Sequence, residues 1–291
     1  MVIGQLIFFF LKNPRWKNHQ GIHNQITGAL AQMAQGNFNV LLDPKDSVFN
    51  ELAEAINDMA QSLGTLEAMR QDFISNVSHE IQSPLTSISG FAALLQKDGL
   101  HDDERRRYAA IIESESKRLS SLSDSLLKLS SLDNNKTPLI KKDFRLDKQL
   151  ESIALMLEPQ WSAKNLQFEA DLPKLTVYGD EDLLSQVWVN LIHNAIKFTP
   201  EGGRIDVVLT MGDDLSVVKI SDTGSGIEPE DQIHIFERFY KVDKARDRSL
   251  GGNGLGLSIV KKIVDMCEGS VNVDSKPDQG TMFKVMLPMV E

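Results

Sequence analysis

Residues 73–91 read FISNVSHEIQSPLTSISGF and combine an apolar helical stripe with a histidine on the opposite face. The stripe has the three- and four-residue spacing of an amphipathic helix, and its members are Phe73, Val77, Ile81, Leu85, Ile88, Ala92 and Leu95. At about 100° per residue, Val77 and Ile81 lie about 40° apart, whereas His79 lies about 180° from their midpoint. His79 is therefore expected to face water.

Two neighbours distinguish His79 from an ordinary solvated surface histidine. Glu80 places a carboxylate beside the imidazole, and Pro84 removes a backbone donor and crowds the carbonyl of Glu80. Pro84 therefore predicts a kink one turn beyond the histidine, a costly feature that points to a functional reason. A neutral imidazole is a nucleophile at one ring nitrogen when the other nitrogen carries its proton.

A second amphipathic helix follows the turn at Asp98-Gly99. Its seam is interrupted only by Glu115 and consists of Tyr108, Ile112, Leu119, Leu122, Leu126 and Leu129. One hairpin with a single apolar face cannot bury that face alone, which favours a four-helix bundle made from two copies. The sequence therefore predicts a homodimer.

The residues before this hairpin predict a membrane-proximal helix pair. One seam contains Ile22, Ile26, Ala29 and Met33, and after the turn residues Gly36, Asn37 and Asp43-Pro44 a second seam contains Phe49, Leu52, Ile56, Met59, Leu63 and Leu66 and breaks near Arg70. The apolar residues 1–11 are too few to cross a bilayer core, which needs about 20. They predict the end of a transmembrane helix or an interfacial anchor, and the basic residues that follow indicate a cytoplasmic flank.

The C-terminal half predicts an α+β domain beyond the polar linker 133–143. Helical patterns at 147–163, 181–198 and 255–268 alternate with strand patterns at 204–211, 214–221, 270–274 and 281–288. This order favours one mixed sheet covered by helices on one face. The net charge of -10 argues against non-specific binding to nucleic acid, and the single Cys267 is expected to be a reduced core residue.

Polar and glycine-rich motifs in this half predict an anion site. Asn190, His193, Asn194 and Lys197 share one helical face, and two glycine motifs follow: DTGSGI, with Asp222, Gly224 and Gly226, and GGNGLGL, with Gly252, Gly254 and Gly256. Glycine lets backbone amides approach phosphate oxygens, and the helix that begins near Leu255 points its free amides toward them. A local phosphate site is therefore compatible with a negative net charge.

Together these motifs resemble those of sensor histidine kinases. Residues 73–91 resemble the phospho-acceptor box, and the later motifs resemble the asparagine and glycine boxes, with FERFYK (236–241) as the phenylalanine box and Gly280-Thr281 as a later glycine element. The resemblance covers residues 12–291 and implies four parts: a membrane segment 1–11, a HAMP-like signal relay 12–65, a dimerisation and phospho-acceptor hairpin 66–134, and an α/β sandwich ATP-binding domain 143–291.

The resemblance also implies a reaction. His79 would take a phosphoryl group from Mg-ATP and pass it to an aspartate of a response regulator receiver domain. Glu80 would hold the imidazole proton, and Ser83 stands where the family positions a water for dephosphorylation, although threonine or asparagine is more usual there. Gln82 replaces a basic residue that is common in the family, which predicts altered rates.

The resemblance assigns the nucleotide contacts as well. Asp222 would accept a hydrogen bond from the adenine amino group, Asn194 would be the Mg ligand, and Asn190 and Lys197 would contact phosphates or the waters of the metal. Backbone and side-chain contacts are expected from Gly224, Gly226, Gly252, Gly254, Leu255, Gly256 and Thr281. His193 is open between nucleotide contact and an ordinary polar role, and residues 228–251 are expected to form a lid.

Two other functions share parts of this pattern. ATPases of the same fold carry a glutamate in place of Asn190 to activate water, and an asparagine cannot act as that base. A catalytically silent coiled-coil scaffold would not need the nucleotide motifs. The hairpin upstream favours phosphoryl transfer, with the kinase portion on the cytoplasmic face of the cell membrane.

Overall fold

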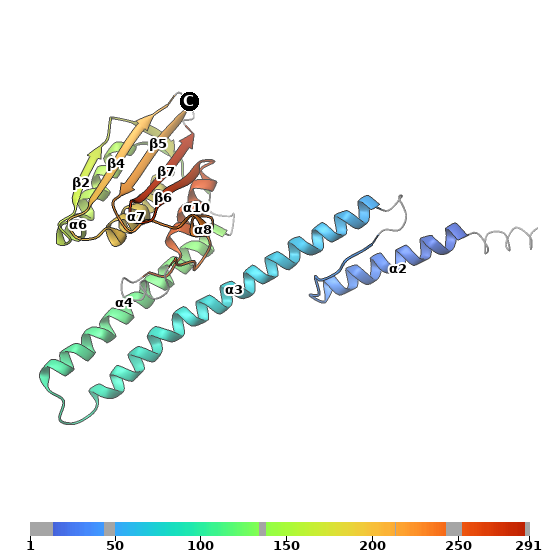
Figure 1. Cartoon of the computed structure of the whole chain (residues 1–291), viewed down its shortest axis with the longest axis horizontal. Coiled ribbons are helices and arrows are strands. Elements are labelled where there is room, and N and C mark those ends of the chain that lie inside the picture. The colour runs from blue at the N-terminus through green and yellow to red at the C-terminus, as the bar shows by residue number, and fades with distance from the viewer. Residues whose placement is uncertain (1–13, 44–49, 134–137, 213, 243–251, 289–291) are drawn as a thin grey trace, which may run out of the picture. The chain divides into compact units, whose positions relative to one another are not determined.

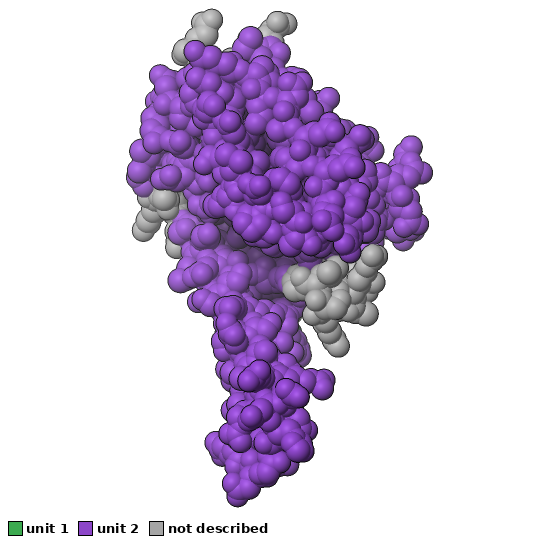
Figure 2. Space-filling model, turned by 90° about the vertical axis from the view of Figure 1, so that its left-hand side faces the viewer, with its two compact units in different colours: residues 1–78 green, residues 79–291 purple. Residues whose placement is uncertain are grey.

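The computed structural model describes residues 14–43, 50–133, 138–212, 214–242 and 252–288. The chain forms two compact units, residues 1–78 and 79–291, and Figure 2 shows the second unit in purple. The expected membrane segment 1–11, the turn at Pro44 with Phe49, and the part of the expected lid at 243–251 lie outside the described residues. Within the described ranges, no helix combines the length and the apolar character that a membrane span requires.

The first unit contains α2 (Pro14–Ala34) and the first part of α3 (Asn50–Leu95). Its small core consists of Met33, Ile56 and Ala60, with Ile26, Phe38, Val40 and Leu42 packed against it. The segment that leaves α2 is held by Asn57, whose side chain accepts from the Leu42 N–H at 2.9 Å and donates to the Leu42 carbonyl at 3.0 Å. The predicted pairing of two helices through a connector is thus observed here.

Helix α3 continues without interruption from Asn50 to Leu95. The break predicted near Arg70 is one in the apolar seam, and the helix itself continues through it. The helix also continues through Pro84, which is buried.

The hairpin of the second unit pairs the C-terminal part of α3 with α4 (Asp102–Asp133). The rings of Phe91 and Tyr108 lie 5.4 Å apart and fix the antiparallel register near the turn. Leu122, Leu129 and Leu132 are buried on α4. As predicted, the hairpin leaves apolar side chains in solvent, Leu85 among them.

The C-terminal α/β domain is built on a five-stranded mixed sheet, shown as one layer in Figure 1. Its strand order is β2 (Gln167–Asp171), β4 (Arg204–Met211), β5 (Leu215–Asp222), β7 (Gly280–Pro288) and β6 (Ser270–Lys276). Only β2 and β4 pair in parallel. The predicted mixed sheet is therefore observed.

Helices pack on the apolar face of this sheet, and a small second sheet lies beside them. The helices are α5 (Leu146–Met156), α6 (Glu158–Ala163), α7 (Glu181–Phe198), α8 (Pro229–Gln232) and α10 (Gly256–Met266). The second sheet pairs β1 (Lys142–Arg145) with β3 (Thr176–Gly179) and was not predicted. Trp188 of α7 is fully buried and donates its Nε1–H to Gln149 Oε1 at 2.9 Å.

Cys267 lies at the end of α10 and is half-buried. Burial raises the pKa of its thiol to about 11, so the reactive thiolate is scarce at neutral pH. The predicted core position is met only in part, because the side chain is half-buried.

Candidate functional site

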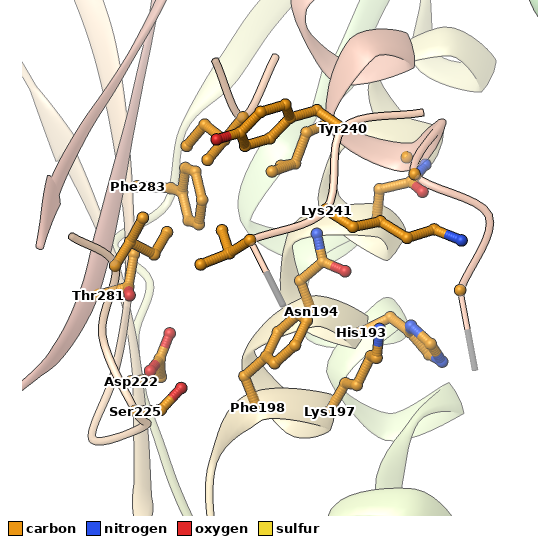
Figure 3. A pocket seen from close by; sticks show the side chains of 18 of the residues that line it. His193, Asn194, Lys197, Phe198, Asp222, Ser225, Tyr240, Lys241, Thr281 and Phe283 are labelled. Carbon is orange, nitrogen blue, oxygen red and sulfur yellow. The ribbon is translucent and has the colours of Figure 1, made fainter. Parts of the chain in front are cut away.

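A cavity of about 520 Å³ opens in the second unit between the hairpin and the α/β domain. Its walls come from α4, α7, the start of α10 and the loops at one end of the sheet. In Figure 3, Asp222, Ser225 and Thr281 lie on one side of the cavity, and His193 and Lys197 lie on the other. The volume is within the range of about 300–1,000 Å³ that is typical of small-molecule sites.

Helix α7 supplies the polar wall because its two faces differ. Trp188, Leu191 and Ile192 are fully buried in the core, whereas Asn190, His193, Asn194 and Lys197 line the cavity. Asp180 begins the helix by accepting from the Leu183 N–H at 3.0 Å. The sequence of α7 therefore determines which face of this helix lines the cavity.

The C-terminal end of α7 is held by one ammonium group. Lys164 Nζ donates to the carbonyls of Ile196 at 2.8 Å, Lys197 at 2.9 Å and Thr199 at 3.0 Å. These carbonyls belong to a helix end that carries partial negative charge, where a cation is favourable. The contact fixes the backbone from which Lys197 and Phe198 reach the cavity.

Asp222 is a buried acid at one side of the cavity. Its Oδ1 accepts from the Gly224 N–H at 2.8 Å, and the Thr281 backbone N–H also hydrogen-bonds to the carboxyl group. Burial outweighs these bonds and raises the pKa of Asp222 to about 6. The carboxylate is thus still charged at neutral pH and can accept a hydrogen bond from a ligand.

His193 and Lys197 give the opposite side of the cavity a different electrostatic character. Burial lowers the pKa of His193, and the neighbouring Lys197 lowers it further. A neutral imidazole therefore lies beside a lysine ammonium group. This side can accommodate an anion without placing two buried cations next to each other.

The glycine-rich segment approaches other backbone closely, which explains its composition. Gly254 has a φ of +68°, and a Cβ added there would lie 2.7 Å from the Phe239 carbonyl carbon. The Phe239 N–H donates to the Gly254 carbonyl at 2.8 Å. A Cβ on Gly256 would lie 2.8 Å from Asn190 Oδ1. A side chain at either position would therefore collide with Phe239 or with Asn190.

The hairpin forms the remaining wall. Arg118, Ser121 and Ser125 share one face of α4 and line the cavity, and Ser125 Oγ accepts from Asn253 Nδ2 at 3.0 Å. Among the described lining residues, none comes from α3. His79 is exposed, as its helical phase predicts, and Ser83 is exposed as well.

Glu80, the neighbour of His79 in the sequence, is engaged by two cations. Its Oε2 accepts from Arg118 at 2.8 Å and its Oε1 accepts from Lys241 at 2.5 Å. The Lys241 contact joins α3 to the loop that follows α8.

Most of the expected nucleotide residues meet at this cavity. The lining includes Asn190, Asn194, Lys197, Asp222, Gly226, Gly252, Gly254, Gly256 and Thr281. Leu255 does not line it, because its side chain is fully buried in the core. Gly224 does not line it either, and contributes instead the N–H that holds Asp222.

Sequence reasoning missed the α4 residues and several apolar lining residues, such as Ile235 and Phe283. Arg118 does not belong to a recognisable sequence motif. Its position at the cavity depends on how the hairpin packs against the α/β domain. Phe236, in the FERFYK segment, packs its ring edge-on against Phe283, with the ring centroids 6.4 Å apart.

The polar side chains that line the cavity suit a nucleoside triphosphate bound with a hard cation such as magnesium. Asn194 offers an amide oxygen, and magnesium commonly takes few protein ligands, with phosphate and water oxygens completing its shell. Asn190 donates its Nδ2 to the Gln186 carbonyl at 2.8 Å, which leaves the side-chain oxygen for the cavity. The described residues contain no cluster of three or more histidine, cysteine or acidic side chains that could bind a metal by itself.

Two family models match the chain. One, described as histidine kinase-, DNA gyrase B- and HSP90-like ATPase, matches residues 179–291. The other, the His Kinase A (phospho-acceptor) domain, matches residues 69–135. The first includes the whole polar wall of the cavity, and the second includes His79 and α4.

Known proteins agree with this assignment. The chain is 36% identical over 267 residues to the heme sensor protein HssS of Staphylococcus saprophyticus (91% of this chain, 57% of the relative), and 37% identical over 226 residues to the sensor histidine kinase RppB of Synechocystis sp. (76% and 49%). It thus spans about half the length of the curated relatives it matches. The histidine kinase ThkA, solved in complex with the response regulator TrrA, superposes with a TM-score of 0.64 at 25% identity (78% of this chain, 64% of that chain).

Both the phospho-acceptor and the ATPase family models match this one chain, and its relatives include a protein named as a sensor histidine kinase. The chain therefore belongs to the histidine kinases of two-component systems.

Proposed function

We propose that this chain binds Mg-ATP in the cavity, phosphorylates its own His79 and transfers the phosphoryl group to an aspartate of a response regulator. The observation that carries the proposal is a nucleotide-sized cavity joined to a helical hairpin that presents an exposed histidine. The cavity has a buried acid on one side and the cations Lys197, Lys241 and Arg118 elsewhere in its lining.

This charge distribution orients the nucleotide. The Asp222 carboxylate would accept a hydrogen bond from the adenine amino group, with Thr281 beside it. The phosphates would then extend toward Lys197 and the glycine-rich loop, where backbone amides and the start of α10 favour negative charge. Leu255 supports this loop from the core, and Gly224 holds Asp222 in place.

Asn194 would hold the magnesium ion, with Asn190 close to its water ligands. When bound, magnesium neutralises phosphate charge and lowers the barrier to phosphoryl transfer. The protein's own contribution is mainly positioning: Lys197 fixes the phosphates, and the apolar lining excludes water from them.

In the transfer step, a ring nitrogen of His79 would form a bond to the terminal phosphorus while the bond to the bridging oxygen of ADP breaks. The second ring nitrogen carries the imidazole proton, and Glu80 would accept a hydrogen bond from it and stabilise the developing positive charge. Because no residue of α3 lines the cavity among those described, the transfer requires the α/β domain to change its position on the hairpin or to serve a second subunit.

The partners follow from the same proposal. ThkA was solved with a response regulator, and a receiver domain docked on the hairpin would place its aspartate beside phosphorylated His79. Ser83 lies one turn further along α3 and is exposed, so it could orient a water for dephosphorylation of that partner. The exposed seam residues of α3, Leu52, Leu63 and Leu85 among them, support a homodimer.

The first unit would relay the signal. We propose that residues 12–65 form a HAMP module, supported by the packing of α2 and α3 around Met33, Ile56 and Ala60. The apolar residues 1–11 and the basic residues after them support attachment to the membrane with the kinase portion in the cytoplasm. Residues 66–134 and 143–291 would be the phospho-acceptor and ATP-binding parts.

The direct test is incubation of the protein with γ-labelled ATP and magnesium. We expect label on the wild-type protein that is stable in alkali and lost in acid, and none on His79→Gln or Asn194→Ala. His101→Gln is the matched control, because His101 is an exposed histidine of the same hairpin. Equal labelling of His79→Gln would eliminate the acceptor, and release of free phosphate without labelled protein would favour an ATPase.

A further inference from the structure

The α4 wall brings one cation to the nucleotide cavity from outside the ATP-binding domain. Arg118, Ser121 and Ser125 lie three and four residues apart, so one helical face provides all three. Among the described lining residues, Arg118 is the only cation that the hairpin contributes. A positive charge on this wall can bind the part of a ligand that lies closest to the hairpin.

Arg118 belongs to a charge network with two carboxylates. It donates to Glu80 Oε2 at 2.8 Å, and its second terminal nitrogen lies 3.7 Å from Glu115 Oε2. Lys241 completes the set at 2.5 Å from Glu80 Oε1. All four side chains are at least 73% buried, so their Coulomb interactions are less screened than those of surface pairs. Two cations and two carboxylates balance in the absence of a ligand.

The network is incompletely satisfied at Glu115, the residue that interrupts the apolar seam of α4. Its Oε2 is buried and accepts no hydrogen bond from any described residue, because 3.7 Å from Arg118 is too long for one. A buried acceptor without a donor is costly. Arg118 is therefore held firmly on one side, by Glu80, and weakly on the other.

Glu80, the carboxylate that holds Arg118, also pairs with Lys241. Both of its oxygens are engaged by cations, although it is the carboxylate next to His79. Each oxygen keeps an acceptor site, but two cations already neutralise the carboxylate, so departure of one cation would strengthen a hydrogen bond from the imidazole to Glu80. A terminal phosphate carries more charge than a carboxylate and matches the planar donor geometry of arginine, so it can compete for Arg118.

We propose that Arg118 recognises the terminal phosphate of ATP and, in doing so, releases Glu80. The cavity thereby distinguishes ATP from ADP through a residue of the hairpin. Arg118 contacts the nucleotide directly and acts on His79 only through Glu80. The inference rests on the proposed function for the identity of the nucleotide, but its test does not need phosphoryl transfer.

The test compares the dissociation constants of the non-hydrolysable analogue AMPPNP and of ADP, measured by calorimetry with magnesium on the full chain. Arg118→Gln is expected to weaken AMPPNP about tenfold, the effect of losing one charge-assisted hydrogen bond, and to change ADP less than about twofold. Arg118→Lys should retain part of the preference. Lys117→Gln is the matched control, because Lys117 is an exposed neighbour on α4 that pairs with Glu113, and both constants should be unchanged.

Glu80→Gln should change the preference for AMPPNP over ADP in the opposite direction. It removes the competitor for Arg118, so the preference for AMPPNP over ADP should increase, and this increase should shrink in the Arg118→Gln background. A purely structural role of the ion pair predicts losses in both variants instead. An equal loss for both nucleotides in Arg118→Gln, or an unchanged ratio, overturns the inference.

The outcome separates this inference from the proposed function. If wild-type protein acquires acid-labile label but Arg118→Gln keeps the wild-type AMPPNP to ADP ratio, only the role of Arg118 fails. If the ratio falls as expected while wild-type protein acquires no label on His79, the kinase assignment fails and the recognition of the terminal phosphate stands. Absence of binding for both nucleotides to wild-type protein overturns both.

Discussion

Asp222 makes nucleotide affinity depend on pH. Its pKa of about 6 lies above the ordinary value of 3.8 because the carboxyl group is buried. The native protein therefore takes up a proton between about pH 6 and 4 that the unfolded chain does not, and this group's contribution to the free energy of unfolding rises as pH falls through that window. Binding has the opposite sign, because a hydrogen bond from an adenine amino group requires the carboxylate.

We expect affinity for ADP to fall about tenfold between pH 7.5 and pH 5, where about nine tenths of a group with a pKa of 6 is protonated. Asp222→Asn should bind weakly at pH 7.5 and show a flatter profile, which also controls for titration of the ligand itself. Calorimetry across this range provides the measurement. A wild-type profile that parallels the Asn variant would contradict the assigned role of the carboxylate.

Sequence reasoning succeeds at the residue scale where one element carries a complete set of groups. Asn190, Asn194 and Lys197 could be placed together because α7 alone determines their common face. Leu255 was misread because a glycine-rich stretch suggests backbone contacts without indicating which side chain the core requires. Arg118 could not be found, since its neighbours belong to a distant part of the chain.

At the scale of the elements, the stability of the C-terminal end of α7 depends on Lys164, which lies outside this helix. Lys164→Met removes the ammonium that three carbonyls at the end of this helix share. We expect the free energy of unfolding to fall by about 1–3 kcal/mol, the cost of leaving such acceptors without a donor. Urea unfolding followed by circular dichroism measures it.

Lys148→Met is the matched control for this variant. Lys148 is an exposed lysine of α5 that pairs only with Glu151 among the described residues, so its replacement should change stability by less than about 0.5 kcal/mol. If the two variants lose equal stability, the capping role of Lys164 is wrong.

The elements that sequence patterns predicted share long apolar periods. The pattern at 181–198 coincides with α7, and the pattern at 204–211 coincides with β4. Strands β1, β2 and β3 have four or five residues each, with charged or polar residues among them. Such short segments become strands only because a partner strand is present, and local sequence does not specify that partner.

For the whole molecule, the apolar seam at the start of α3 predicts association. Leu52, Met59, Leu63 and Leu66 are all at least 38% exposed, although their spacing is that of a coiled-coil seam. Leu63→Lys should shift the protein toward monomer in light scattering coupled to size exclusion, because it places charge in the proposed interface.

Ser62→Lys is the control for this experiment, since Ser62 is exposed one position away on the same helix but off the seam. It should leave the oligomeric state unchanged. A wild-type protein that is monomeric at micromolar concentration would exclude this seam as an interface.

The buried indole of Trp188 gives the molecule an internal optical reporter. The three tryptophans are Trp16, Trp161 and Trp188, so the segment 66–134 contains none. Loss of the apolar surroundings of Trp188 shifts fluorescence emission to longer wavelength, whereas melting of the helical segment 66–134 changes ellipticity at 222 nm without involving an indole. A single thermal ramp recorded both ways would therefore reveal whether the ATP-binding domain and the helical stem unfold together or in turn.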